Sequence, residues 1–257
     1  MSRLALRSIA LFYLAALLVV PVAMVFYRAF EDGIAAAWDA VTTPPAQHAF
    51  YLTITITLIA VPLNAIFGVI TAWVLARYDF RGKRILDVLI DLPFAVSPVI
   101  VGLSLILVWG RDGWFGSTEV IFSTPGMVLA TIFISLPFVV REVLPVLEEE
   151  GTDQEQAAST LGARGHQVFW RITLPTIRWG LTYGVILSTA RAIGEFGAVA
   201  VVSGKIQGRT ETLTLYVEDR FQSLDLAGAY AAGVVLALLG VTVLALMTLL
   251  QRRHGRI

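Results

Sequence analysis

Two charged residues, Arg191 and Glu195, lie near the middle of a long apolar stretch at positions 179–203. They are four residues apart, so on a helix they share one face and can form an ion pair. At 1.5 Å per residue from Trp179, Arg191 lies roughly 18 Å into the stretch. An isolated charge at the centre of a membrane span costs about 2.5–3.5 kcal/mol. The pair is therefore either a structural ion pair that fixes helix packing or a functional pair inside the membrane, and the sequence leaves both interpretations open.

Other common chemistries lack the residues that they need. The chain has no cysteine and only three histidines, which lie far apart at positions 48, 166 and 254, so we expect no metal site. No HExxH motif and no well-placed Ser/His pair supports an intramembrane enzyme. The Gly204-Lys205 pair lacks the earlier glycine and the following hydroxyl of a phosphate-binding loop. We predict that the chain is not an enzyme and holds no cofactor itself.

The elements that must position the charged pair are membrane-spanning helices. Of the 257 residues, 57% are hydrophobic and only 15% are charged, and the mean hydropathy is +0.77, which is far from the balance of soluble domains. A span needs about 20 apolar residues. We predict an all-α membrane protein with a single transmembrane domain over 1–257. Its six expected spans are 9–30, 51–76, 85–109, 126–147, 179–203 and 228–250.

The distribution of Lys and Arg predicts the orientation. With six spans, thirteen of these residues lie on the side of the two termini and five on the opposite side. Cytoplasmic loops carry the excess of positive charge, so both termini should be cytoplasmic. We expect a multi-pass protein of a bacterial plasma (inner) membrane.

The inner loop between the fourth and fifth spans, about 148–178, differs from the other loops. Thr152 or Asp153 is placed to cap a short helix, and Gly162 is a natural left-handed terminator for it. Such a helix, held between two spans, could dock on a soluble partner or lie on lipid headgroups. Composition alone does not separate these two roles.

This loop resembles the "EAA…G…I-L-P" signature of ABC-importer permeases. The matching residues are Gln156, Ala157, Ala158, Gly162, Ile172, Leu174 and Pro175. Gln156 departs from the pattern, because the family usually has glutamate there and this chain has Glu155 one position earlier. The resemblance implies a type I ABC-importer permease fold and a cytoplasmic coupling helix that contacts a separate ATPase subunit. The contact residues that it implies are Asp153, Glu155, Gln156, Ala157, Ala158, Leu161, Gly162 and Ala163.

Three further segments resemble permease subunits of sulfate/thiosulfate importers, most closely the CysW type. They read "ARAIGEFGAVAVVSGKIQGRTETL", "LPFAVSPVIVGLSLILVWG" and "SLPFVVREVLPVL". The resemblance implies uptake of sulfate, with thiosulfate as a further substrate, driven by ATP and magnesium bound to the partner ATPase dimer. Molybdate or tungstate import and a self-sufficient secondary transporter or channel are the alternatives. The implied partners are also an extracytoplasmic binding protein and a second permease subunit of the CysT type, with a heterodimer favoured over a homodimer.

Polar residues at depth in the spans are few, and they define the predicted path. The candidates for the translocation path or gate are Arg191, Glu195, Ser97 and Asn64. For Asn64 and the serine hydroxyls, hydrogen bonding between helices is the alternative role. Pro93 and Pro98 predict a bend in the third span, whereas Arg141, at the inner end of the fourth, is expected to anchor the interface.

Overall fold

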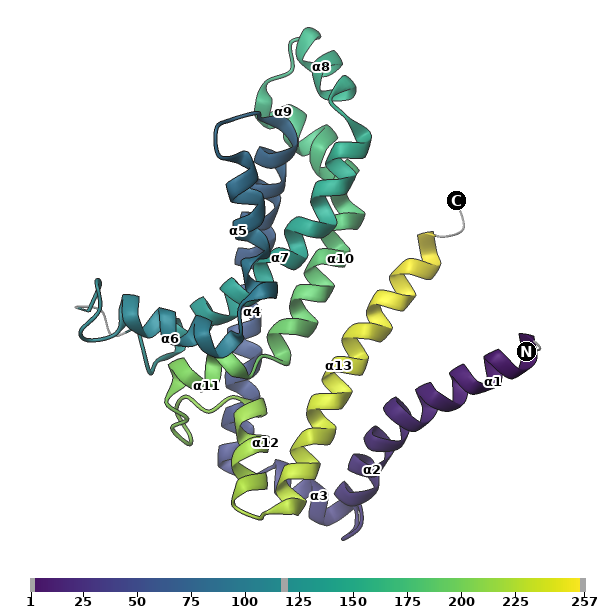
Figure 1. The fold of residues 1–257 in the computed structure, drawn as a ribbon, viewed down its shortest axis with the longest axis vertical. Coiled ribbons are helices and arrows are strands. Elements are labelled where there is room, and N and C mark those ends of the chain that lie inside the picture. The colour runs from purple at the N-terminus through teal and green to yellow at the C-terminus, as the bar shows by residue number, and fades with distance from the viewer. Residues whose placement is uncertain (1–2, 117–119, 255–257) are drawn as a thin grey trace.

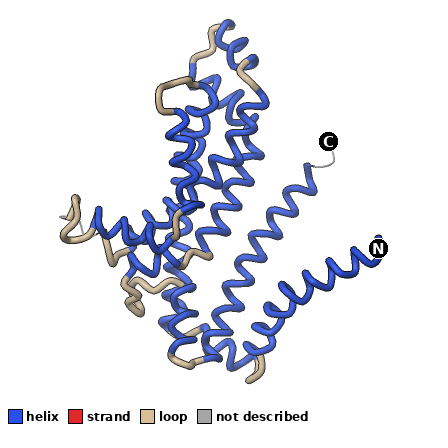
Figure 2. Tube along the Cα trace, in the orientation of Figure 1, coloured by secondary structure: helices blue, strands red, loops and turns tan. Residues whose placement is uncertain are grey.

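The computed structural model describes residues 3–116 and 120–254, and every regular element in these ranges is a helix (Figures 1 and 2). The prediction of an all-α protein is confirmed. In chain order the elements are α1 Arg3–Leu14, η1 Ala15–Val19, α2 Val20–Ala29, α3 Ile34–Val41, α4 Pro44–Arg77, α5 Lys83–Ala95, α6 Pro98–Trp109, α7 Thr124–Glu150, α8 Asp153–Thr160, α9 Gly165–Val168, η2 Phe169–Thr173, α10 Leu174–Ile193, α11 Gly197–Ser203, α12 Leu213–Gln222 and α13 Leu226–His254. The elements η1 and η2 are short π-helical turns within longer helices.

Helices α4, α7 and α10 form the central bundle (Figure 1). Two glycines let these helices approach closely, because both face Val139 of α7. A Cβ atom on Gly184 of α10 would lie 2.8 Å from the Val139 Cα atom, and one on Gly68 of α4 would lie 2.6 Å from its Cγ1 atom. Small residues at such crossings let helix backbones pack closely inside a membrane.

Two of the expected spans are broken. Helices α5 and α6 meet at 114°, and the helix that runs to the end of α10 meets α11 at 54°. The first break follows from Pro98, which pushes Ser97 out of the helical region, as the proline pattern predicted. The expectation of a continuous helix over 179–203 is wrong: α10 ends at Ile193, and Gly194 caps it.

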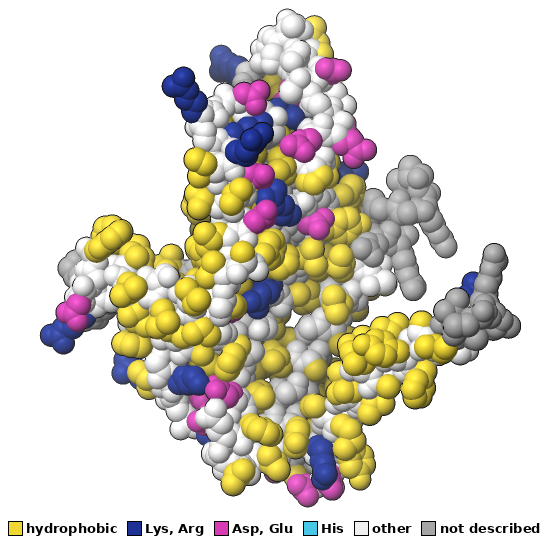
Figure 3. All heavy atoms as spheres, in the orientation of Figure 1, with side chains coloured by type: hydrophobic (Ala, Val, Ile, Leu, Met, Phe, Trp, Pro, Cys, Tyr) yellow, Lys and Arg dark blue, Asp and Glu magenta, His cyan; other side chains and the backbone are white. Residues whose placement is uncertain are grey.

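Within the described residues, four helices are long and apolar enough to span a membrane, or six if each bent pair is one span. The segment Arg7–Ala29 is mostly exposed within the chain, and Ala29 at its end is the one residue of it that is buried. Together with α13 it splays away from the central bundle (Figure 1). Apolar side chains dominate the middle of the surface, while charged side chains gather near the end that carries α8 (Figure 3). This pattern fits a protein that is surrounded by lipid and by other membrane subunits.

Candidate functional site

Helix α8, in the loop between α7 and α9, ends in a hydrogen-bonded turn that matches the predicted role of Gly162. Gly162 has φ +84°, which is the left-handed conformation. Its N–H donates to the Ser159 carbonyl at 3.0 Å, and the Ala163 N–H donates to the Ala158 carbonyl at 3.0 Å. These two bonds form a Schellman motif, which satisfies carbonyls at the end of the helix. The turn fixes the direction in which α8 leaves the membrane domain.

The outer face of α8 is small and apolar at its C-terminal end. The Leu161 side chain is 89% exposed, and Ala157, one helical turn earlier, is also exposed. The start of the helix differs from the prediction, because neither Thr152 nor Asp153 makes a side-chain cap. Instead the Thr152 hydroxyl accepts a hydrogen bond from the Gln156 side chain at 2.8 Å. The helix therefore projects a free apolar tip at the far end of the molecule (Figure 1).

The Glu155 side chain is turned toward the membrane helices and is 18% exposed, and its contact with an ATPase subunit stays a prediction. Its carboxylate forms an ion pair with Arg77 of α4, at 2.9 Å between Glu155 Oε2 and Arg77 Nε. Thr173 of η2 donates a further hydrogen bond to Glu155 Oε1 at 2.8 Å. This orientation was not predictable from the sequence, because the direction in which a short helix turns each face depends on neighbours that are distant in the chain.

Arg191 and Glu195 lie beside the break between α10 and α11. Their Nη2 and Oε2 atoms are 2.8 Å apart, with the arginine side chain 32% exposed and the glutamate side chain 1% exposed. Glu195 Oε1 also accepts a hydrogen bond from the Ala198 N–H at 3.1 Å, at the start of α11. The expected ion pair is present, but it stabilises a helix break rather than a continuous helix. The Arg191 side chain as a whole is only partly covered by this chain.

The other predicted path residues do not converge on this pair. Asn64 is fully buried, and its amide donates to the Ser135 hydroxyl of α7 at 2.7 Å, which is the helix–helix role. Ser97 lies at the break between α5 and α6 and is exposed. Ser104 bonds its own helix through the Ile100 carbonyl at 2.9 Å. The structure brings together Arg191 and Glu195, and separately Asn64 and Ser135.

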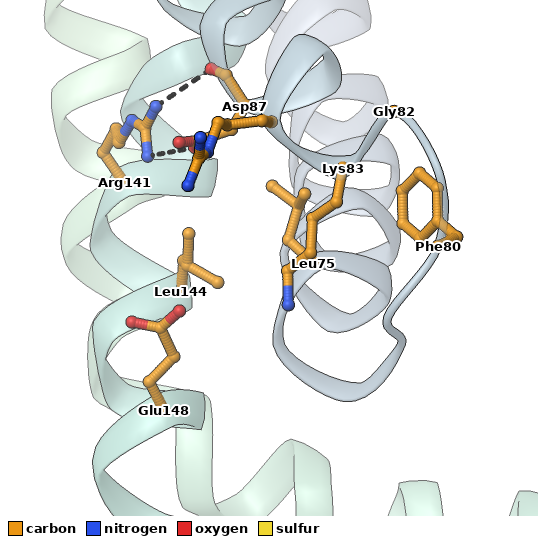
Figure 4. A pocket seen from close by; sticks show the side chains of 9 residues that line it. Leu75, Phe80, Gly82, Lys83, Asp87, Arg141, Leu144 and Glu148 are labelled. Atoms are coloured by element: carbon orange, nitrogen blue, oxygen red, sulfur yellow. Dashed lines mark hydrogen bonds and ion pairs between the residues drawn. The ribbon is translucent and has the colours of Figure 1, made fainter.

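A second arginine cluster, which the sequence did not predict, lies between α5 and α7. Arg141 forms ion pairs with Asp87 at 2.8 Å and with Asp91 at 2.6 Å. The cluster borders an open cavity of about 640 Å³ near the loop between α4 and α5 (Figure 4). Lys83 and Glu148 also line it, so both signs of charge face the same space. This arrangement agrees with the expected role of Arg141 as an anchor, because it ties α5 to α7.

Glu211 is a buried acid that the sequence reading also missed. It lies in the segment between α11 and α12, outside the spans, and is 2% exposed. Burial raises the pKa of Glu211 to about 7; Asp219 contributes to this increase, whereas Arg220 and His48 oppose it. Within the described part of the chain its Oε2 atom has no hydrogen-bond partner. A buried acid without a full set of partners is more stable in its protonated form.

We expect Glu211 to make the stability of the protein depend on pH. Because its pKa is higher in the folded state, its contribution is fully present below the ordinary value of 4.5 and is lost as the pH rises through about 7. Glu211→Gln should therefore raise the melting temperature relative to the parent at pH 8 and change it little at pH 5. Thermal unfolding in detergent measures this, with the exposed Glu31→Gln as a control. An equal shift at both pH values would contradict the expectation.

Comparisons with known proteins agree with the helical architecture and with the resemblance to importer permeases. The family model described as "Binding-protein-dependent transport system inner membrane component" matches residues 64–256. The sulfate transport system permease protein CysW of Synechocystis is 52% identical, over 97% of this chain and 93% of the relative. The corresponding CysT protein of Synechococcus elongatus is 39% identical, over 95% and 90%. One chain of a bacterial alginate ABC transporter has the same fold, with a TM-score of 0.78 and 17% sequence identity over 98% of this chain and 94% of that one. That transporter was solved in complex with a periplasmic protein that binds an alginate pentasaccharide.

Proposed function

This chain belongs to the family of inner membrane components of binding-protein-dependent transport systems, and we propose that it is a membrane-spanning subunit of an ATP-driven sulfate importer. The observation that supports sulfate as the substrate is the near full-length similarity to CysW proteins, whose name assigns them to sulfate transport. Thiosulfate is a second tetrahedral dianion that the same path would accept. The chain itself would be a transporter component and not an enzyme, with ATP and magnesium bound by a separate subunit.

The free tip of α8 supports the proposed contact with that ATPase subunit. Leu161 and Ala157 form a small exposed apolar surface, and its burial against a partner would be favourable. The Gly162 turn fixes the direction of this surface. Dimerisation of the ATPases on ATP would draw two such helices together and favour the outward-facing state of the permease pair. The role that we assign to α8 is therefore that of the coupling helix.

The splayed helices support a second permease subunit. Most of Arg7–Ala29 is exposed within this chain, since only Ala29 is buried and only Val25 and Phe26 are half-buried, and only 11% of the most apolar stretch of α13 is buried. We infer that these helices pack against a CysT-like partner, with both termini in the cytoplasm, as the Lys and Arg distribution favours. The similarity to both CysW and CysT sequences favours a heterodimer. An extracytoplasmic binding protein would deliver the anion to the opposite face.

Arg191 supports a polar path for the anion. Sulfate carries two negative charges, and lipid does not accommodate it. The Arg191 side chain is 32% exposed, while Glu195 neutralises part of its charge. This balance would let the site contact a dianion without holding it so tightly that transport stops. Asn64 and Ser97 would contribute only if a different conformation brings them to the path.

The test is reconstitution of the chain in liposomes with its co-purified subunits and the cognate binding protein. We expect uptake of radiolabelled sulfate that requires ATP, together with an ATPase and a second permease in the purified complex. Uptake by the chain alone would contradict the importer proposal and favour a secondary transporter or channel. Uptake of micromolar molybdate in place of sulfate would overturn the assignment of the substrate.

A further inference from the structure

Arg77 and Glu155 join three separate parts of the membrane domain to α8. Arg77 ends α4 and uses all of its guanidinium nitrogens. Its Nε and Nη2 atoms donate to the two Glu155 oxygens at 2.9 and 3.2 Å, and its Nη1 atom donates to the Leu147 carbonyl of α7 at 2.8 Å. Thr173, just before α10, donates to the same carboxylate. We call these four residues the Arg77–Glu155 junction.

The junction is tightly packed and largely shielded from water. The Arg77 side chain is 9% exposed and that of Glu155 is 18% exposed. The space left among the surrounding residues is about 10 Å³, the lower limit for a single water molecule. A bidentate arginine–carboxylate pair fixes both distance and direction. A displacement of Glu155 should therefore move Arg77 by a similar distance.

The rest of α8 is only loosely attached to the membrane domain. Gln156 bonds Thr152 next to it, and the Ser159 and Thr160 hydroxyls bond carbonyls of their own helix. In the described residues, the side-chain bonds that lead from α8 to α4 and η2 all end on Glu155. Besides the backbone, which joins α8 to α7 and to α9, the side-chain connection of this helix to α4 and η2 therefore depends on one carboxylate.

We propose that Arg77 and Glu155 are positioning residues that transmit the movement of α8 to α4, α7 and α10. This inference rests on the proposed function, because it assigns the junction to ATP-driven transport. It also assigns Glu155 a role that differs from direct contact with the ATPase. An ion pair that only stabilised the loop would affect the amount of folded complex, whereas a positioning pair sets how much sulfate moves for each ATP hydrolysed.

The experiment uses the complete reconstituted transporter and measures imported sulfate per ATP hydrolysed. Glu155→Gln keeps the shape but removes the charge, and Arg77→Gln/Glu155→Gln removes both charges so that no buried charge is left unpaired. We expect both variants to hydrolyse ATP but to import about tenfold less sulfate per ATP, within the range of typical coupling between sites. Stimulation of the ATPase by the loaded binding protein should fall in parallel. Asp79→Asn is the control, because the Asp79 side chain is 98% exposed and should leave the ratio unchanged.

The outcomes separate coupling from stability. A double variant with the parental ratio of sulfate to ATP would overturn the proposal, and so would a double variant that fails to assemble, since the pair would then be purely structural. If the parent itself shows no ATP-dependent uptake, the proposed function fails instead. A double variant that assembles normally but imports less sulfate per ATP hydrolysed supports the proposal that the junction transmits the movement of α8.

Discussion

Replacing Arg191 by alanine is expected to abolish sulfate uptake and to reduce the amount of assembled transporter. The substitution leaves the Glu195 carboxylate buried, at 1% exposure, without its ion-pair partner. Removing one member of a buried pair costs about 3–5 kcal/mol, which is roughly a hundredfold or more in an equilibrium. The loss of assembly and the loss of uptake would coincide in this single variant, so it does not distinguish a structural role from a transport role.

The double variant Arg191→Ala/Glu195→Gln separates the two roles. The glutamine oxygen can still accept the Ala198 N–H bond that begins α11, while no charge remains unpaired. We expect this variant to assemble with its partner subunits, as measured by co-purification, but to transport no sulfate in liposomes. The result would identify the guanidinium as the group that the anion needs. Normal uptake by the assembled double variant would instead mean that the pair only holds the helix break.

A matched control is available in α2. Arg28 and Glu31 form an ion pair of similar length, 2.7 Å, but both side chains are exposed. Exposed pairs contribute only about 0–1 kcal/mol. Arg28→Ala/Glu31→Gln should therefore leave assembly and uptake unchanged. Both double variants remove an Arg–Glu ion pair, so a difference in uptake between them shows that the location of the pair at the break between α10 and α11 matters.

The local features of this fold were predictable because each depends on neighbouring residues. Gly162 ends α8 in the left-handed conformation since no other common residue adopts it as easily, and Pro98 bends the third span because it restricts Ser97. The apolar stretches predicted the helices that can span a membrane, because length and composition suffice for that. The ion pair at positions 191 and 195 also followed from helical spacing.

Apart from the missing side-chain cap at the start of α8, the features that the sequence did not predict depend on contacts between distant segments. The break after Ile193 is stabilised by Glu195 and by the Thr214 hydroxyl, which donates to the Glu195 carbonyl at 2.9 Å, and the sequence around Gly194 carries no clear stop signal for a membrane helix. Likewise, Glu155 turns inward because Arg77, 78 positions earlier, lies beside it. A single sequence shows charges and spacing, but it does not show which distant partner each charge meets.

Replacing Gly162 by valine is expected to uncouple ATP hydrolysis from sulfate uptake. Gly162 has φ +84° and no atom would lie within 4 Å of an added Cβ, so any penalty comes from the backbone and not from a clash. A left-handed residue with a side chain costs about 1–2 kcal/mol, enough to shift an equilibrium between loop conformations about 5–30-fold. The helix end would then adopt another turn, and the exposed Leu161 would no longer face the ATPase at the required angle.

Gly165→Val is the appropriate control for this substitution. Gly165 begins α9 only three residues later, and an added Cβ would also meet no atom within 4 Å, but its backbone is not left-handed. The two variants therefore add the same side chain to equally open sites and differ only in backbone strain. We expect Gly162→Val to hydrolyse ATP with little uptake, while Gly165→Val transports as the parent does. Equal uptake by both variants would mean that the left-handed turn is not needed for coupling, and that the apolar tip of α8 finds its partner without it.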